Sequence, residues 1–213
     1  MADLLFVRPA DDQAAQVCSA IGGRLWRWVQ YNAHSIPTWT TVDLAGSANA
    51  TRTNIDAELR NGHRHLFYFG HGNSSGLIAN GSSLVDITNI HLLPSSAIVV
   101  AVACHSLNGL GATSTANGHV AAYLGWGDQL AIPGLYPNPM IDALCDGLLP
   151  LLQGNDLQVS KTALEECLSD ALTNYQSWQP PPTAGAGAAL FAKMACTYAI
   201  YCLDIEGNLA AVL

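Results

Sequence analysis

Two residues with matching chemistry, an imidazole and a thiol, each follow an apolar run of the sequence. The first run covers residues 65–70 and leads into His71, and the second covers residues 97–103 and leads into Cys104. A thiol becomes an effective nucleophile as its thiolate, and an imidazole that titrates near neutral pH is the usual base that assists it. His71 and Cys104 therefore form a candidate catalytic pair.

Glycines flank His71 on both sides. A residue without a side chain lets the backbone approach a substrate closely, and its amide can point at a developing oxyanion. We expect the amides of Gly72 and Cys104 to serve in this way. In the corresponding chemistry Cys104 attacks a carbonyl, His71 passes a proton to the leaving amine, and water resolves the acyl-enzyme, without a cofactor or a metal ion.

Strands and helices alternate along the chain, and their arrangement has to bring the two residues together. Apolar runs at 4–7 and 39–44 have the length of strands, and helical spacing follows each of them. Asp11 or Asp12 could cap the first of these helices, and the second helix is expected over 47–60. We expect a loop and a short crossover over 73–94 and a strand over 119–126. The remaining expected elements are helices over 140–152, 161–178 and 188–195 and two strands at 198–204 and 209–213.

This alternation predicts a layered α/β domain with a mostly parallel central sheet and helices on both faces. Ligands of such sheets bind beyond the carboxyl ends of the strands, so His71 and Cys104 share one edge if their strands are neighbours. The chain has 213 residues, half of them apolar, which suits one well-buried core. We therefore expect a single domain over residues 1–213.

The composition restricts the partners and the compartment. Eight Lys and Arg against 16 Asp and Glu give a formal net charge of -8, which argues against nucleic acid or an anionic membrane surface as the main partner. Neither a membrane-spanning apolar stretch nor a signal peptide is evident. The six cysteines lack the paired short spacings of a zinc site. We expect a soluble cytoplasmic protein with mostly reduced thiols.

An apolar strand ending in His-Gly, followed by an apolar strand ending in Ala-Cys, resembles the caspase, metacaspase, gingipain, clostripain and separase group of cysteine peptidases. The likeness covers about residues 4–126. Within the group the sequence looks closest to the bacterial CHAT-type branch, because Ser106 and a Gly-rich turn at 108–111 follow Cys104. The resemblance implies a caspase-like three-layer α/β/α sandwich, a protein or peptide substrate, and control by a partner protein, by analogy in bacterial defence. The sequence indicates no site for processing into two subunits and no third residue that orients His71.

Specificity in this group depends on the charge of the pocket that receives the side chain before the scissile bond. Asp128 would line an acidic pocket for Arg or Lys, whereas Arg8, at the end of the first strand, would meet an acidic side chain; Asp128 is preferred. Trp126 ends a strand on the same edge and is a further candidate for substrate contact. The ordinary alternatives are solvated loop charges and a core tryptophan.

The leading hypothesis is a cysteine endopeptidase that cuts a protein partner at a restricted site. A catalytically silent caspase-like module would instead bind a partner through the same groove, although an intact His71 and Cys104 count against it. A hydrolase or transferase that acts on a small molecule through Cys104 is disfavoured. The sequence has neither a Gly-x-Ser-x-Gly elbow nor a phosphate-cradling loop after the first strand.

Overall fold

The computed structural model describes residues 3–32, 39–185 and 187–213, and in this part of the chain a six-stranded sheet forms the centre of the molecule. Five strands are parallel, and the sixth, β9, pairs antiparallel with β8 at one edge. The order across the sheet is β2 (Thr40–Ala45), β1 (Asp3–Arg8), β3 (His65–Phe69), β7 (Ile98–Val102), β8 (Ala122–Trp126) and β9 (Leu203–Gly207).

The inner strands are apolar at nearly every position because both faces of the sheet are covered. All five residues of β3, of β7 and of β8 are buried. Successive side chains of a strand point to opposite faces. Phe67 and Phe69 therefore join the core on one face, while Leu66 and Tyr68 join the core on the other. Continuous apolar runs of this kind are typical of buried parallel strands.

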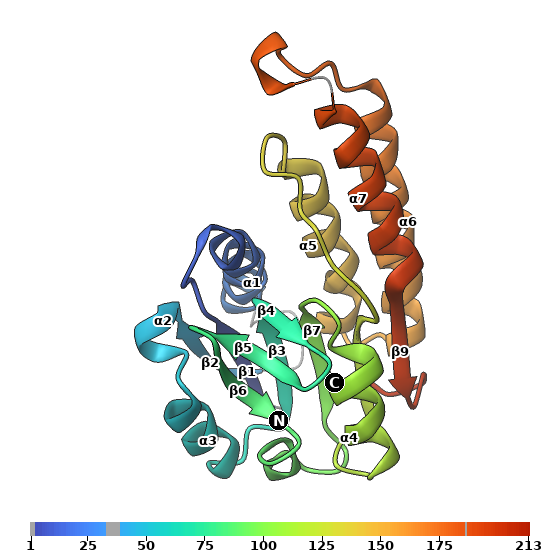
Figure 1. Cartoon of the computed structure of the whole chain (residues 1–213). Coiled ribbons are helices and arrows are strands. Elements are labelled where there is room, and N and C mark those ends of the chain that lie inside the picture. Colours follow the sequence, from blue (N-terminus) through green and yellow to red (C-terminus); the bar gives the residue numbers. More distant parts are fainter. Residues whose placement is uncertain (1–2, 33–38, 186) are drawn as a thin grey trace.

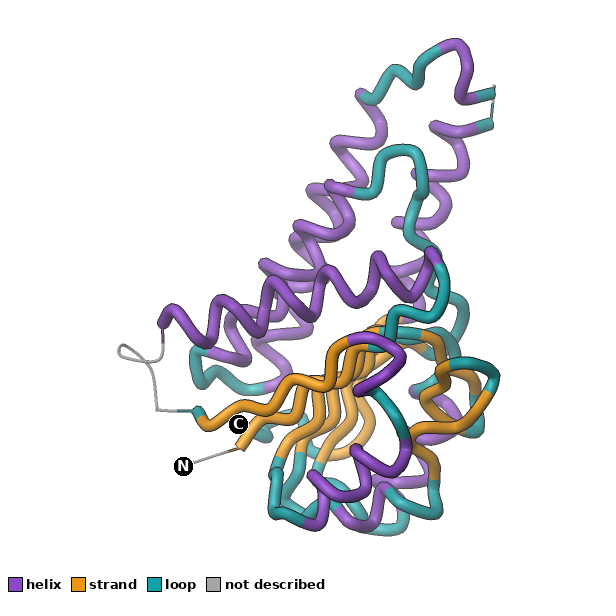
Figure 2. The backbone as a smooth tube through the Cα atoms, turned by 90° about the vertical axis from the view of Figure 1, so that its left-hand side faces the viewer, coloured by secondary structure: helices purple, strands orange, loops and turns teal. Residues whose placement is uncertain are grey.

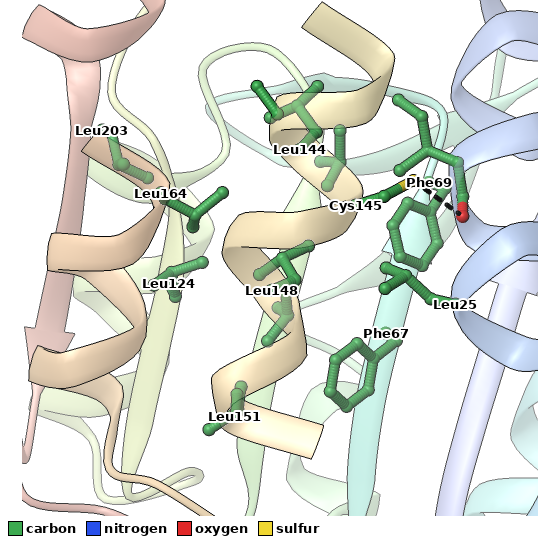
Figure 3. Close-up of a cluster of buried hydrophobic side chains, with 14 of the residues drawn as sticks. Leu25, Phe67, Phe69, Leu124, Leu144, Cys145, Leu148, Leu151, Leu164 and Leu203 are labelled. Atoms are coloured by element: carbon green, nitrogen blue, oxygen red, sulfur yellow. Dashed lines mark hydrogen bonds between the residues drawn. The ribbon is translucent and has the colours of Figure 1, made fainter. Parts of the chain in front are cut away.

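Four long helices cover the first face, as Figures 1 and 2 show. They are α1 (Gln13–Asn32), α5 (Asn138–Leu152), α6 (Leu157–Ser177) and α7 (Ala188–Cys202). Figure 3 shows how α5 fills the space between them, with its side chains directed at residues of the sheet and of α1; the labelled α5 residues are Leu144, Cys145, Leu148 and Leu151. Among the described helices none combines the length and apolar character needed to cross a bilayer.

The second face is covered by shorter elements. They are α2 (Gly46–Asn49), α3 (Arg52–Arg60), the antiparallel strands β4 (His71–Asn73), β5 (Gly76–Ala79) and β6 (Ser82–Asp86), the turns η1 (Ile90–Leu92) and η2 (Leu107–Gly111), and α4 (Ala112–Ala116). A further turn, η3 (Pro182–Ala184), lies between α6 and α7. The predicted α/β/α sandwich with a mostly parallel sheet is confirmed, with a small sheet as part of one outer layer.

Four predicted elements were wrong in kind or extent. The helix expected over 47–60 is two helices, α2 and α3, separated by an N-cap at Thr51. The loop expected over 73–83 belongs to the small sheet, whose last hairpin turns at Asn80 and Gly81 with φ of 50° and 70°. The segment 198–204, expected as a strand, holds the end of α7 and the start of β9, and the segment 209–213, also expected as a strand, is a turn followed by a loop. The apolar run before residue 203 continues the helical spacing of α7, so it cannot serve as a strand.

Candidate active site

The neighbouring strands β3 and β7 bring His71 and Cys104 to the same edge of the sheet. Phe69 pairs with Val102 in the parallel register, and each candidate residue lies two positions beyond that pair. The Gly70 amide continues the ladder by donating to the carbonyl oxygen of Val102 at 3.2 Å. The two strands are neighbours, which is the condition under which the sequence analysis expected His71 and Cys104 to share one edge.

His71 and Cys104 line one cavity of about 260 Å³. Its other walls come from Ala14 and Cys18 of α1 and from the loop at residues 129–132 that follows β8. In the described part of the chain, His, Cys, Asp and Glu side chains form no group of three or more that could hold a metal ion. The cavity therefore combines a thiol and an imidazole with mostly apolar surroundings.

Gly72 lies directly against the backbone of Cys104. A Cβ atom at position 72 would lie 2.7 Å from the Cys104 carbonyl oxygen and 2.9 Å from the Cβ atom of Ala103. Both distances are shorter than real Cβ contacts, so only glycine lets β4 begin against the end of β7. The use of the Gly72 and Cys104 amides as oxyanion donors stays a prediction.

Asp12 holds the imidazole of His71. The Oδ2 atom of Asp12 lies 2.8 Å from Nε2 of His71, and Oδ1 accepts the N–H of Ala15 at 2.8 Å, as an N-cap of α1 does. The hydrogen bond from the Ala15 amide and, to a smaller extent, the hydrogen bond with His71 lower the pKa of the Asp12 carboxyl. A carboxylate only accepts hydrogen bonds, so the proton of the neutral ring lies on Nε2 and Nδ1 is left to exchange a proton. From the sequence alone, Asp12 is predicted only as a possible helix cap.

The thiol of Cys104 is half-buried and contacts the backbone of Leu130. Its Sγ atom accepts the N–H of Leu130 at 3.3 Å and donates to the carbonyl oxygen of the same residue at 3.5 Å. Burial raises the pKa of the Cys104 thiol, and the Leu130 amide opposes that rise. Because a raised pKa favours the protonated form, this thiol needs a proton acceptor before it can act as a nucleophile at neutral pH.

Asp128 lies close to the Cys104 segment but in a separate hollow. Its carbonyl oxygen accepts the N–H of His105 at 2.9 Å, and its Oδ1 atom lies 3.2 Å from Nδ1 of the same histidine, which has a positive φ of 52°. The hydroxyl of Tyr198 donates to Oδ2 at 2.6 Å and lowers the pKa of the Asp128 carboxyl. Asp204 and Glu206 line the same hollow of about 250 Å³. The hollow is therefore strongly acidic.

Arg8 and Trp126, the other two candidates for substrate contact, have partners inside the fold. Arg8 forms a bidentate ion pair with Asp43, in which Nε of Arg8 lies 2.7 Å from Oδ1 and Nη2 lies 2.5 Å from Oδ2. Trp126 is fully buried, and its indole N–H donates to the carbonyl oxygen of Ala199 at 2.9 Å. Neither side chain lines the cavity of His71 and Cys104. In this structure both residues stabilise the fold.

Comparison with known proteins gives matches in structure alone. No family model matches the chain, and no curated protein sequence matches it. The Arg-specific cysteine proteinase gingipain R matches with a TM-score of 0.61 and 13% identity, over 99% of this chain and 47% of that one. A complex of the pro- and mature domains of Porphyromonas gingivalis RgpB matches with a TM-score of 0.58 and 11% identity, over 100% and 48%. A structure described only as a protease matches with a TM-score of 0.61 and 12% identity, over 99% of this chain and 48% of that one.

The chain thus spans about half the length of each of these proteins. At 11–13% identity the likeness establishes the fold and leaves the activity to be argued from the site. The CHAT-type branch has no support in these matches and stays a prediction. The chain has the caspase-like α/β/α fold that gingipain R also has.

Proposed function

We propose that this chain is a cysteine endopeptidase in which Cys104 is the nucleophile and His71 transfers the proton. The observation that carries the proposal is the shared cavity, where the thiol and an imidazole held by Asp12 lie at the ends of two adjacent strands. Cysteine proteinases with the same fold support it. A protein or peptide is the corresponding substrate.

In the proposed reaction, the Sγ atom of Cys104 attacks the substrate carbonyl carbon while the thiol proton passes to Nδ1 of His71. The same proton then goes to the amine as the peptide bond breaks, which leaves a thioester on Cys104. Water, deprotonated by His71, hydrolyses the thioester and returns the thiol. The amides of Gly72 and Cys104 are the proposed donors to the oxyanion.

Asp12 acts in this scheme as a positioning residue. It keeps the Nε2 proton in place, so that Nδ1 remains the acceptor, and its negative charge stabilises the imidazolium that forms when the thiol loses its proton. The raised pKa of the Cys104 thiol implies that the free enzyme holds a neutral thiol. Proton transfer to His71 therefore accompanies the attack on the substrate and does not precede it.

We further propose a basic residue before the scissile bond. Asp128 lies in an acidic hollow, while Arg8, which would favour an acidic residue, is already neutralised by Asp43. The loop that begins at Gln129, next to Asp128, forms a wall of the cavity that holds Cys104. Gingipain R, which has the same fold, is described as Arg-specific. Control by a partner protein and a role in bacterial defence rest on the family resemblance described above.

Peptide cleavage by matched variants tests the proposal. The wild type, Cys104→Ala, His71→Ala and Cys167→Ala proteins are incubated with fluorogenic peptides that carry Arg, Lys, Asp or Ala before the scissile bond. Cys167 is a half-exposed cysteine of α6 that lies outside the cavity, so its loss controls for general thiol effects. Lysate of the source organism is added in parallel to supply any activating partner.

We expect cleavage by the wild type and by Cys167→Ala, and none by Cys104→Ala or His71→Ala. Arg and Lys peptides should be preferred, and Asp128→Asn should lower kcat/KM for these peptides selectively. A preference for Asp peptides would contradict the specificity proposal. Equal background signals from all four proteins, with and without lysate, would contradict the peptidase and favour a module that only binds a partner.

A further inference from the structure

Three hollows of the surface follow one another from the proposed catalytic pair, and each shares lining residues with the next. The near hollow is the cavity of about 260 Å³ that holds His71 and Cys104. The middle hollow, of about 420 Å³, shares four lining residues with it: Ala14, Cys18, Leu130 and Ile132. The far hollow, of about 290 Å³, shares Gln13 and Gly134 with the middle one. Because each hollow shares lining residues with the next, we refer to the three together as the groove.

The groove runs from the edge of the sheet toward the helices α6 and α7. Its walls are the first turns of α1 and the loop between β8 and α5, and its far hollow ends at Trp178, just after α6, and at Phe191 of α7. Figure 1 shows α6 and α7 side by side, with the connection between them far from the sheet. The far hollow is therefore distant from the reacting thiol and lies along a path that an extended peptide can follow.

Aromatic contacts give the far hollow a preformed shape. The rings of Tyr136 and Trp178 lie 5.2 Å apart between centroids, and the ring of Tyr136 meets Tyr175 edge-on at 5.9 Å. The hydroxyl of Tyr175 donates to the carbonyl oxygen of Tyr136 at 3.0 Å. These contacts tie the loop that carries Leu135 to α6, so the hollow needs little ordering when a ligand enters.

The chemistry of the lining changes along the groove. Asp12 and His71 lie at the near end, whereas the far hollow is lined by Pro133, Gly134, Leu135, Trp178, Ala188 and Phe191 with Gln13 as its polar residue. Leu135 and Phe191 are 63% and 53% exposed, so the apolar lining of the far hollow faces solvent. An exposed apolar surface that continues a reaction site is suited to an apolar part of the substrate.

We propose that the far hollow binds a bulky apolar side chain of the substrate, aromatic or leucine-like, several residues away from the scissile bond. This inference rests on the proposed peptidase function and specifies its substrate: a peptide cut beside a basic residue and anchored by a distant hydrophobic one. The walls that each hollow shares with the next and the uncharged lining of the far hollow carry it. Binding there would hold the chain in register for attack by Cys104.

The test scans one Phe through each position on both sides of the scissile bond in an otherwise Ala-rich peptide with Arg before the cut. Phe191→Ser and Leu135→Ser remove the apolar surface at exposed positions, where the fold does not depend on them. Met194→Ser is the matched control, because Met194 lies on the same helix, is 62% exposed and does not line the hollow.

We expect one position of Phe to raise kcat/KM about tenfold over the all-Ala peptide, and Phe191→Ser and Leu135→Ser to remove that gain. Met194→Ser should keep the gain and should cleave the all-Ala peptide at the wild-type rate. No preferred position for Phe, or an equal gain in Phe191→Ser, would overturn the inference while cleavage itself still supports the peptidase.

Binding to an inactive protein separates the two proposals. Anisotropy of a labelled Phe peptide is measured with Cys104→Ala and with the Cys104→Ala, Phe191→Ser double variant, so that no catalysis is needed. About tenfold weaker binding by the double variant supports the far hollow even if no peptide is cleaved. Equal affinity of the two proteins would overturn it.

Discussion

Replacement of Asp12 separates two tasks that one carboxylate performs. Oδ1 caps α1 through the N–H of Ala15, and Oδ2 holds Nε2 of His71. Serine is an equally good N-cap, but its short side chain does not reach the imidazole. Asp12→Ser should therefore keep the helix cap and lose the orientation of His71, whereas Asp12→Ala should lose both.

The size of each effect follows from the exposure of the pair. Positioned proton transfer contributes about a hundredfold to ten-thousandfold, and loss of a buried orienting carboxylate can remove most of it. Since the Asp12 side chain is 56% exposed, water replaces part of the lost bond, and we expect kcat to fall about 10- to 30-fold in both variants. Loss of the cap adds about 1 kcal/mol of instability in Asp12→Ala, a fall in Tm of about 2 to 4 °C.

Two measurements decide this prediction: steady-state kinetics on several peptides, and thermal unfolding of the same preparations. A positioning role requires kcat to fall by the same factor on Arg, Lys and Ala peptides, with KM unchanged. A fall confined to the Arg and Lys peptides would show that Asp12 binds the substrate instead. A wild-type kcat in Asp12→Ser would refute the orienting role. A fall in Tm in Asp12→Ser as large as the fall in Asp12→Ala would refute the separation of that role from the helix cap.

Gly72→Ala should lower kcat by about a hundredfold, because the new Cβ atom collides with the backbone of Cys104 and shifts it; wild-type kinetics would contradict this close packing. Alkylation of Cys104 by iodoacetamide should still accelerate as the pH passes 9, since burial raises the pKa of this thiol above the ordinary 9.0 and the thiolate share grows until the pH exceeds the pKa. A plateau already at neutral pH would show a preformed thiolate. Trp126→Phe should lower the free energy of unfolding in urea by about 1 to 3 kcal/mol, because the hydrogen bond to Ala199 and some packing are lost, and should leave kcat unchanged.

The predictable parts of this fold are those that local sequence determines. Strands β3 and β7 are buried throughout and almost entirely apolar because both their faces are covered, and their ends place His71 and Cys104 where parallel sheets bind ligands. The small sheet also had a local signal, the Asn80-Gly81 pair that favours a tight hairpin turn, and sequence analysis overlooked it.

Contacts between distant segments were not predictable in the same way. Asp12 and His71 are 59 positions apart, and they meet because β1 and β3 are neighbours in the sheet, so that the residues after both strands share one edge. The end of α7 was mistaken for a strand because a short apolar run fits either structure. Trp126 and Arg8 were considered for substrate contact, but their partners, Ala199 and Asp43, become evident only when the chain is folded.

Covalent labelling tests the central claim most directly. A peptidyl acyloxymethyl ketone with Arg at its reactive end is incubated at neutral pH with the wild type and with His71→Ala, and the adducts are located by mass spectrometry. We expect one adduct, on Cys104, that forms at least tenfold more slowly in His71→Ala. The other five cysteines, Cys18, Cys145, Cys167, Cys196 and Cys202, should remain unmodified. An adduct spread over several cysteines, or equal labelling of Cys104 without His71, would contradict the catalytic pair.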